Sequence, residues 1–465
     1  MESNIRRGLF WAALLHGLAY CLLLPAWMGE DEPWHVEYAS YVVDGHGPFG
    51  VESVSKEKWE ADLAVATYRQ VQIQRRFPSI SAEAIEGRQA QIVSSMAREN
   101  FSGRVDWAPP LEGAVEFDSL APNFSAIHQP PLYYFLLGNL GRGLGLDTPR
   151  EILFAGRALS LVAFVIVAML ILGIGQRVFP SDRATVLAVL FAILLPMHAR
   201  HSSVVNNDVL AKVLCAGVLF ASLYATGYSW RRVGAVLVLS ALALAAKPTA
   251  AAVAGVAVLF AVYSAWGSPL ASKQKTLTRA LRIGLPLLVV ASSAALYLGS
   301  LDHGPVVSNT WHNFADRLQG SFSPKFLLEL LGTSVGRFNW QSRPISPALV
   351  GLLGAGIGVL GVVIGKRLLG ATSEPGRGSR FLLRVCLLFS LAQLALVVLR
   401  GVPIGRYLAP ALPAIAILVG SLAWGEERGH SSSRWVIGIF LVLVAFSSYF
   451  LWGGLVFNQY VVLGA

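Results

Sequence analysis

The chain has 465 residues, of which 54% are hydrophobic and 14% are charged, and its formal net charge is +10. Soluble domains carry about 25% charged residues, so the composition argues against a soluble protein. In a soluble protein this positive charge would suggest nucleic acid. In a membrane protein, Lys and Arg in short loops mark the cytoplasmic side instead. We therefore expect a membrane protein with no nucleic-acid partner.

Long apolar runs recur along the chain and predict membrane-spanning helices. A hydrocarbon core needs about 20 mostly apolar helical residues, and these runs lack the alternation of barrel strands. Backbone groups in lipid must also be satisfied within each segment. The predicted fold is an all-α polytopic transmembrane helical bundle with about eleven spans. They lie at residues 9–28, 154–176, 184–199, 209–228, 233–246, 249–266, 283–300, 346–365, 381–399, 408–424 and 435–456.

One large segment outside the membrane separates the first two spans. The predicted division is a first span within 1–28, a large external loop at 29–153 and a multi-span region at 154–465. The loop contains two polar helical stretches, around Lys56–Phe77 and Ser81–Asn100, with a turn at Pro78 between them. We expect helices of this loop to lie along the membrane surface.

The segment Pro131–Leu146 decides the topology, because it is apolar but short, rich in glycine and interrupted by Arg142. If it does not cross the membrane, most Lys and Arg residues of the short loops are cytoplasmic, as the positive-inside rule requires. If it crosses, this bias reverses. We therefore expect an interfacial helix on the outer leaflet, with Tyr133 and Tyr134 at headgroup level. The large first loop is then external.

Residues 29–37, GEDEPWHVE, gather four carboxylates and a histidine just after the first span. Charges at the end of a span are commonly snorkelling or solvated. Acids at this density also suit a general base or a cation site. We take Asp31 and Glu32 as candidate catalytic residues and His35 as a candidate substrate contact.

Three further motifs lie on the predicted external side. Residues 127–134, IHQPPLYY, contain two prolines that prevent a regular helix and set a turn after His128. Asn206-Asn207-Asp208 opens the fourth span, where an Asp can also serve as an N-cap. Lys247 stands between apolar runs, as either a turn residue or a functional charge, because charge at membrane depth is costly. Arg157, near the outer start of the second span, falls under the same argument.

The short external loop 400–407 carries Arg400 and Arg406 against the positive-inside bias. Arginines near the outer leaflet need an anionic partner, which is either a lipid phosphate or a carboxylate of the chain. The topology brings six scattered residues to one face: Asp31, His128, Arg157, Asp208, Lys247 and Arg406. A carboxylate base with cations that hold a phosphate fits transfer of a group away from a phosphate leaving group.

These motifs, taken in order, resemble the GT-C superfamily of membrane glycosyltransferases, which includes the protein O-mannosyltransferases and the aminoarabinose transferases of lipid A. The chain looks closest to the DUF2142 family of membrane proteins and to RgtA/B/C/D-like transferases. The matching pieces are Asp31-Glu32-Pro33 with His35, His128-Gln129-Pro130-Pro131-Leu132-Tyr133-Tyr134, Arg157 with Ser160, Asn206-Asn207-Asp208, Lys247-Pro248, and Gly405-Arg406-Tyr407-Leu408-Ala409-Pro410. Together they cover most of the chain. Many members read His-Pro-Pro-Leu, whereas Gln129 intervenes here.

The resemblance implies a glycosyltransferase that moves a sugar from a polyprenyl-phosphate donor to a lipid, glycan or protein acceptor on the outer face. It implies that Asp31 is the acceptor-side base and that Asp208 lies in a second acidic loop at the same site. The implied donor-phosphate ligands are Arg406, Lys247 and Arg157, and the expected substrate contacts are His35, His128 and Tyr407. The expected reaction is an inverting single displacement, which needs only one base because phosphate leaves without protonation.

Several alternatives stay open at this point. A divalent metal, Mg²⁺ or Mn²⁺, could bridge Asp31, Asp208 and the phosphate, or Arg and Lys could do the same work. A transporter or flippase of a lipid-linked or anionic substrate would place its site near mid-bilayer, with buried charges on broken spans. Lys212 is a candidate for such a charge. A non-catalytic envelope assembly protein is the third alternative. Compact loops favour the bacterial inner membrane, with the site facing outside.

Overall fold

The structure, a computed structural model, describes most of the first half of the chain and parts of the second. The described residues are 1, 3–29, 31–47, 68–99, 126–201, 203–223, 230–256, 377–400 and 405–423, with isolated positions between 326 and 445. Within these ranges every regular element is a helix. The expectation of an all-α fold is therefore confirmed for this part of the chain.

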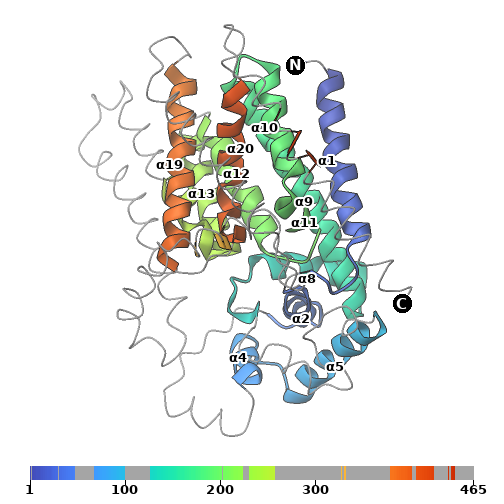
Figure 1. The fold of residues 1–465 in the computed structure, drawn as a ribbon. Helices are drawn as coiled ribbons and strands as arrows, with labels where there is room; N and C mark the ends of the chain where they lie inside the picture. The colour runs from blue at the N-terminus through green and yellow to red at the C-terminus, as the bar shows by residue number, and fades with distance from the viewer. Residues whose placement is uncertain are drawn as a thin grey trace, which may run out of the picture.

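Seven helices run side by side as a bundle (Figure 1). They are α1 (Ser3–Leu23), α9 (Pro149–Val178), α10 (Asp182–Leu194), α12 (Asp208–Leu223), α13 (Trp230–Ala246), α19 (Arg377–Arg400) and α20 (Leu412–Gly420). Helix α9 packs against α1, α10 and α12, while α12 also packs against α13. A buried apolar core contributed by these helices holds the bundle together.

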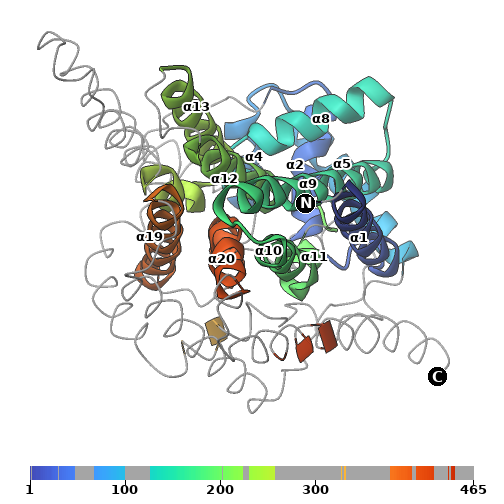
Figure 2. The same cartoon turned by 90° about the horizontal axis from the view of Figure 1, so that it is seen from above.

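A second group of helices lies across one end of this bundle, and we call it the crosswise layer. It consists of α2 (Glu32–Val43), α4 (Tyr68–Arg76), α5 (Ala82–Arg98) and α8 (Leu132–Leu144). Figure 2, viewed along the bundle, shows α8 lying crosswise to the bundle axis at one side of the molecule, near α2 and α13. Helices α2 and α8 pack closely, because Gly138 of α8 has no Cβ that would collide with Val42. The layer has its own apolar core, which reaches α9 through Ile152 and Leu153.

Local sequence signals explain where these helices begin and end. Thr148 and Glu151 form a reciprocal capping box at the start of α9, with Pro149 in its first turn. Ser81 caps α5, since its hydroxyl accepts from the amide of Ala84 at 3.2 Å. Helix α8 ends at Gly145, which has a left-handed φ of 67°.

Several predicted elements are present as helices. The stretches 154–176, 233–246 and 381–399 lie within α9, α13 and α19. In the first loop, the stretch Ser81–Asn100 corresponds to α5, whereas only Tyr68–Arg76 of Lys56–Phe77 falls among the described residues. The stretch 209–228 is described as far as Leu223, and 249–266 as far as Val256. The stretches 283–300 and 346–365 lie outside the described residues, as does nearly all of 435–456.

Two predicted boundaries are wrong, and a proline lies at each. Helix α1 ends at Leu23 instead of residue 28, just before Pro25. The stretch 184–199 is interrupted at Leu195, and the short helix α11 (Pro196–His201) follows, because a proline lacks the amide needed to continue a helix. The predicted stretch 408–424 agrees with the helical segment Arg406–Ala423, which begins as a 3-10 helix, η6 (Gly405–Ala411), and continues as α20. These interruptions lie beside the candidate site described below.

Two helical segments among the described residues are long and apolar enough to cross a membrane. They are Pro149–Val178 and Arg406–Ala423, which joins η6 to α20. Val233–Ala246 and Leu383–Val397 are apolar but shorter. By length and composition, the described part of the chain therefore supports membrane association through these two segments.

Candidate functional site

The scattered motifs meet where the crosswise layer touches the end of the bundle (Figure 1). Asp31 precedes α2, Asp208 is the first residue of α12, and Arg406 lies in η6. Lys247 stands between α13 and the 3-10 helix η3 (Pro248–Ala250). These four residues form two ion pairs, Asp31–Arg406 and Asp208–Lys247, which we call the ion-pair cluster.

The first pair joins the start of α2 to η6. Nη1 of Arg406 lies 2.5 Å from Oδ2 of Asp31, and both side chains are largely buried. The Arg406 guanidinium also lies 5.8 Å from the centroid of the Tyr407 ring. Asp31 has a φ of 61°, a conformation that residues other than glycine rarely adopt. Backbone conformations of this kind gather at functional sites, where the surrounding structure must hold them.

The second pair is deeper, since the Asp208 side chain is fully buried. Nζ of Lys247 lies 2.5 Å from Oδ1 of Asp208, and the Asp208 amide donates to Oδ1 of Asn206 at 2.8 Å. Oδ2 of Asp208 has no hydrogen-bond partner within the described ranges. Burial alone would raise the pKa of Asp208, but Lys247 and Arg406 lower it to about 2. Burial lowers the pKa of Lys247, while Asp208 opposes that effect.

His35 lies next to the cluster and links α2 to α8. Its Nδ1 is 2.7 Å from the Tyr134 hydroxyl. The Tyr134 ring in turn stacks on Tyr38 at 3.9 Å between centroids. Burial lowers the pKa of His35 to about 3, and the positive charges of Lys247 and Arg406 act in the same direction. His35 is therefore a neutral hydrogen-bonding group at physiological pH.

The proline turn of residues 127–134 is hydrogen-bonded to both the crosswise layer and the bundle. Arg76 of α4 donates to the carbonyls of Ile127 at 3.2 Å and Gln129 at 3.0 Å. The side chain of Gln129 accepts from Nδ2 of Asn207 at 3.2 Å, and this nitrogen also donates to the Ala246 carbonyl. Gln129, which interrupts the His-Pro-Pro-Leu pattern, thus connects the turn to the Asn-Asn-Asp motif. The backbone of His128 lies in a 3-10 turn, and its side chain is outside the described residues.

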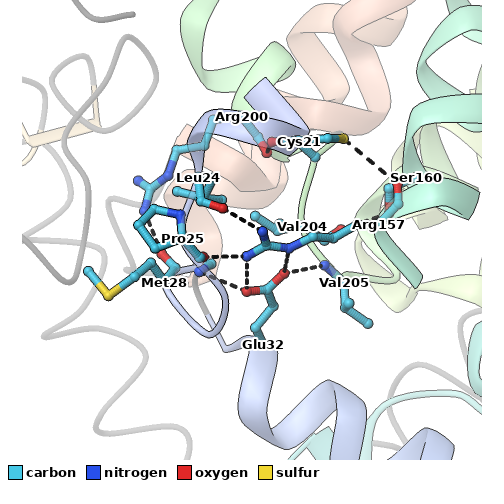
Figure 3. Close-up of polar contacts among 12 residues, drawn as sticks. Cys21, Leu24, Pro25, Met28, Glu32, Arg157, Ser160, Arg200, Val204 and Val205 are labelled. Carbon is cyan, nitrogen blue, oxygen red and sulfur yellow. Dashed lines mark hydrogen bonds and ion pairs between the residues drawn. The ribbon is translucent and has the colours of Figure 1, made fainter. Parts of the chain in front are cut away.

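Glu32 and Arg157 form a third pair, shown in Figure 3. Nε and Nη2 of Arg157 donate to the two carboxylate oxygens of Glu32, each at 2.8 Å. Arg157 also donates to the carbonyls of Leu24 at 2.6 Å and Pro25 at 2.7 Å. Glu32 accepts from the amides of Gly29 and Val205 as well. All three guanidinium nitrogens and both carboxylate oxygens thus already have partners within the chain.

The Glu32–Arg157 pair holds the turn that carries Asp31. It joins the end of α1, the start of α2 and the N-terminal part of α9, and Val205 connects it to the loop before Asp208. Ser160 supports the same loop, because its hydroxyl donates to the Val204 carbonyl at 2.7 Å. The structure therefore brings all described site candidates together, but it divides them into the ion-pair cluster and this supporting pair.

Gln393 is a site residue that sequence reasoning missed. Its Nε2 donates to the carbonyls of Thr249 at 2.9 Å and Tyr407 at 2.5 Å, which ties α19 to η3 and η6. Lys247 directly precedes η3, and Arg406 lies within η6. An amide in the middle of the apolar stretch 381–399 was the available signal, because a polar side chain there needs a partner.

A metal ion bound to Asp31 and Asp208 would have to displace the cations that already pair with them. The described part of the chain contains no group of three or more His, Cys, Asp or Glu side chains that could hold one. Asp31 and Asp208 each bind a cationic side chain, so Arg406 and Lys247 already supply positive charge to both carboxylates.

Comparison with known proteins does not assign the site. No protein-family model matches the chain, and no curated protein matches it. The interpretation therefore rests on the chemistry of the cluster: two buried carboxylates, each beside a cation, at the end of an apolar helical bundle. Such a set can bind an anion through its cations and accept a proton through a carboxylate released from them.

Proposed function

We propose that this protein is a polytopic membrane glycosyltransferase of the GT-C type. It moves a sugar from a polyprenyl-phosphate donor to an acceptor hydroxyl at the outer face of the bacterial inner membrane. The observation that carries this proposal is the meeting of Asp31, Asp208, Lys247 and Arg406 in one buried cluster below the bundle. A base and phosphate-binding cations in one place are what this transfer requires.

The exposed surface of the bundle supports its position in a membrane. Large apolar side chains point outward from its helices, including Trp11, Leu15, Leu22, Val162, Ile166, Val238, Leu388 and Leu391. Soluble monomers rarely expose extended apolar surface, whereas lipid contact makes such side chains favourable. Together with the two segments of spanning length, this supports a multi-span bundle of about eleven helices as part of the proposal.

Helix α8 fits a position at the outer membrane surface. Its outward face carries Phe135, Leu136, Leu140 and Leu144, which are 40–63% exposed. Tyr133 and Tyr134, expected at headgroup level, are instead buried in the core of the crosswise layer. A helix that lies across the bundle and exposes apolar side chains suits the boundary between headgroups and acyl chains. The ion-pair cluster would then lie at the depth of lipid phosphates.

The proposed reaction begins when the donor phosphate binds to Arg406 and Lys247 in place of their carboxylate partners. Asp31, released from Arg406, accepts the proton of the acceptor hydroxyl. The hydroxyl oxygen attacks the anomeric carbon, and the bond from that carbon to the phosphate oxygen breaks. The phosphate keeps the bonding electrons, and the two cations stabilise its charge without protonation. Attack from the opposite side inverts the anomeric centre, and Asp31 then gives its proton to solvent.

The surrounding residues have supporting roles in this proposal. Glu32 and Arg157 form an ion pair with each other, so in this proposal they hold the backbone of Asp31 and do not contact substrate. His35 is a neutral hydrogen-bonding group beside the cations. Tyr407 lies against Arg406 and helps to orient it. His128 keeps its predicted place as a substrate contact.

The test is release of polyprenyl phosphate from a panel of polyprenyl-phospho-sugars by the full-length protein in lipid nanodiscs. Membrane extract supplies the acceptors. We expect release by the wild type and a loss of about 100-fold or more in Asp31→Asn. The matched control is Asp182→Asn at the start of α10, whose carboxylate pairs with the N-terminal amine. Equal release by wild type and Asp31→Asn would remove Asp31 from the role of base.

A transporter is the second candidate, because one observation favours it. Helix α10 breaks at Leu195–Pro196, and buried Lys212 contacts His198 of α11. Transporters bind substrates at broken helices with buried charges. Movement of a labelled polyprenyl-phospho-sugar across proteoliposome membranes, without release of its sugar, would support this candidate against the transferase.

A further inference from the structure

Lys212 is a buried cation that the proposed reaction does not use. It lies in α12, one helical turn after Asp208, and its side chain is almost fully buried. Its Nζ is 3.1 Å from Nδ1 of His198, which is its one side-chain partner within the described ranges. An ammonium group has three donors, and a charge within an apolar bundle is costly and generally functional.

The position of Lys212 relates it to Asp208. Residues four apart on a helix lie on the same face, so both side chains project from the same side of α12. Asp208 uses only Oδ1 for its pair with Lys247, and Oδ2 is buried without a hydrogen-bond partner among the described residues. Lys212 is thus a second cation next to a carboxylate that has an unused oxygen.

A second cation becomes necessary once a phosphate binds. Lys247 cannot turn to a phosphate without weakening its 2.5 Å contact with Asp208. A buried carboxylate that loses an ion-pair partner is strongly destabilised. Phosphate binding would therefore be opposed unless another cation neutralised Asp208.

We infer that Lys212 is a positioning residue that neutralises Asp208 when Lys247 moves to a lipid phosphate. The inference rests on the proposed function, because it takes a lipid phosphate as the ligand of Lys247 and Arg406. The cluster then contains three cations, Lys212, Lys247 and Arg406, and two carboxylates. The positive charge in excess binds the phosphate. Lys212 acts on the ligand only through Asp208, without touching it.

The experiment measures binding of farnesyl phosphate to the full-length protein in nanodiscs, with farnesol as the uncharged counterpart. Lys212→Met keeps an unbranched apolar side chain in the bundle and removes the charge. We expect it to weaken farnesyl phosphate binding by about tenfold and to leave farnesol binding unchanged. The matched control is Ser222→Ala, which alters a buried polar residue of the same helix far from the cluster.

The double variant Asp208→Asn/Lys212→Met separates this role from a merely structural one. With the carboxylate neutral, Lys212 has nothing to compensate, so binding should return to within about threefold of Asp208→Asn alone. A lysine needed only for packing would show no such rescue. If Lys212→Met does not fold, Lys212→Gln supplies the neutral variant, and Lys212→Arg should keep the wild-type affinity.

Two results would overturn the inference while leaving the proposed function intact. One is wild-type affinity for farnesyl phosphate in the neutral Lys212 variants, and the other is no rescue in the double variant. Wild-type protein that binds farnesol as tightly as farnesyl phosphate would instead contradict the phosphate site itself, and the inference with it.

Discussion

Asp31 and Arg406 are separated by 375 positions in the chain, yet their charged groups lie 2.5 Å apart. Asp31 stands at the entry to the crosswise layer, whereas Arg406 opens the last described part of the bundle. Their contact joins the two parts of the fold at the point where both carry charge. A ligand that separates this pair would therefore act on the proposed base, Asp31, and on the layer that supports it.

Replacement of Arg406 tests its role in stabilising the leaving group. We expect Arg406→Gln to lower kcat/KM by about 100-fold or more, the usual effect of removing a group that stabilises developing negative charge. Arg406→Lys should lose less, because it keeps the charge. The measurement is the rate of polyprenyl phosphate release at several donor concentrations. Unchanged kcat/KM in Arg406→Gln would exclude a phosphate contact.

The Arg157–Glu32 pair should matter chiefly for stability. Arg157→Met leaves Glu32 buried without its partner, so we expect a loss of about 3–5 kcal/mol in the free energy of unfolding. The matched control is Arg150→Gln, which breaks a partly exposed pair with Glu99 and should lose less than about 1 kcal/mol. Chemical unfolding in detergent measures both. Similar losses in the two variants would contradict the supporting role of the buried pair.

The buried His35 should make stability depend on pH. Burial lowers its pKa in the folded protein to about 3 from the usual 6.5. The unfolded chain therefore binds the proton more readily, and stability falls as pH drops from about 6.5 toward 3. In His35→Gln this part of the dependence should disappear, so the curve of unfolding temperature against pH becomes flatter over that range. An unchanged curve would show that His35 is accessible to protons in the folded state.

Helix α8 should contact lipid along its outward face. In a chain whose three cysteines are replaced by alanine, a spin label at Leu136, Leu140 or Leu144 should be reached by oxygen dissolved in lipid. A label at the exposed position Gly87 of α5 should instead be reached by a water-soluble nickel complex. Electron paramagnetic resonance in nanodiscs measures both accessibilities. Preferential water access along α8 would contradict its proposed place at the membrane surface.

Much of the fold was predictable from local patterns. Apolar stretches predicted α9, α13 and α19, and the polar helical stretch Ser81–Asn100 after the turn at Pro78 predicted α5. The helix within Pro131–Leu146 was also predicted, because a segment that does not cross the membrane keeps the positive-inside bias of the loops; the structure shows it as α8. The boundaries near Pro25 and Pro196 were missed, since hydropathy does not show where a proline ends a helix.

The candidate site was predictable in its residue types but not in its pairing. The sequence by itself determined that Asp31, Asp208, Lys247 and Arg406 are costly charges beside apolar runs, which need partners for that reason. Only the tertiary structure decided which charge meets which, because each partner comes from a distant helix. It also decided that Arg157 binds Glu32, since the two backbone carbonyls that complete its contacts belong to the turn after α1. A sequence shows which charged side chains lie beside apolar runs. The packing of the helices decides which opposite charge pairs with each of them.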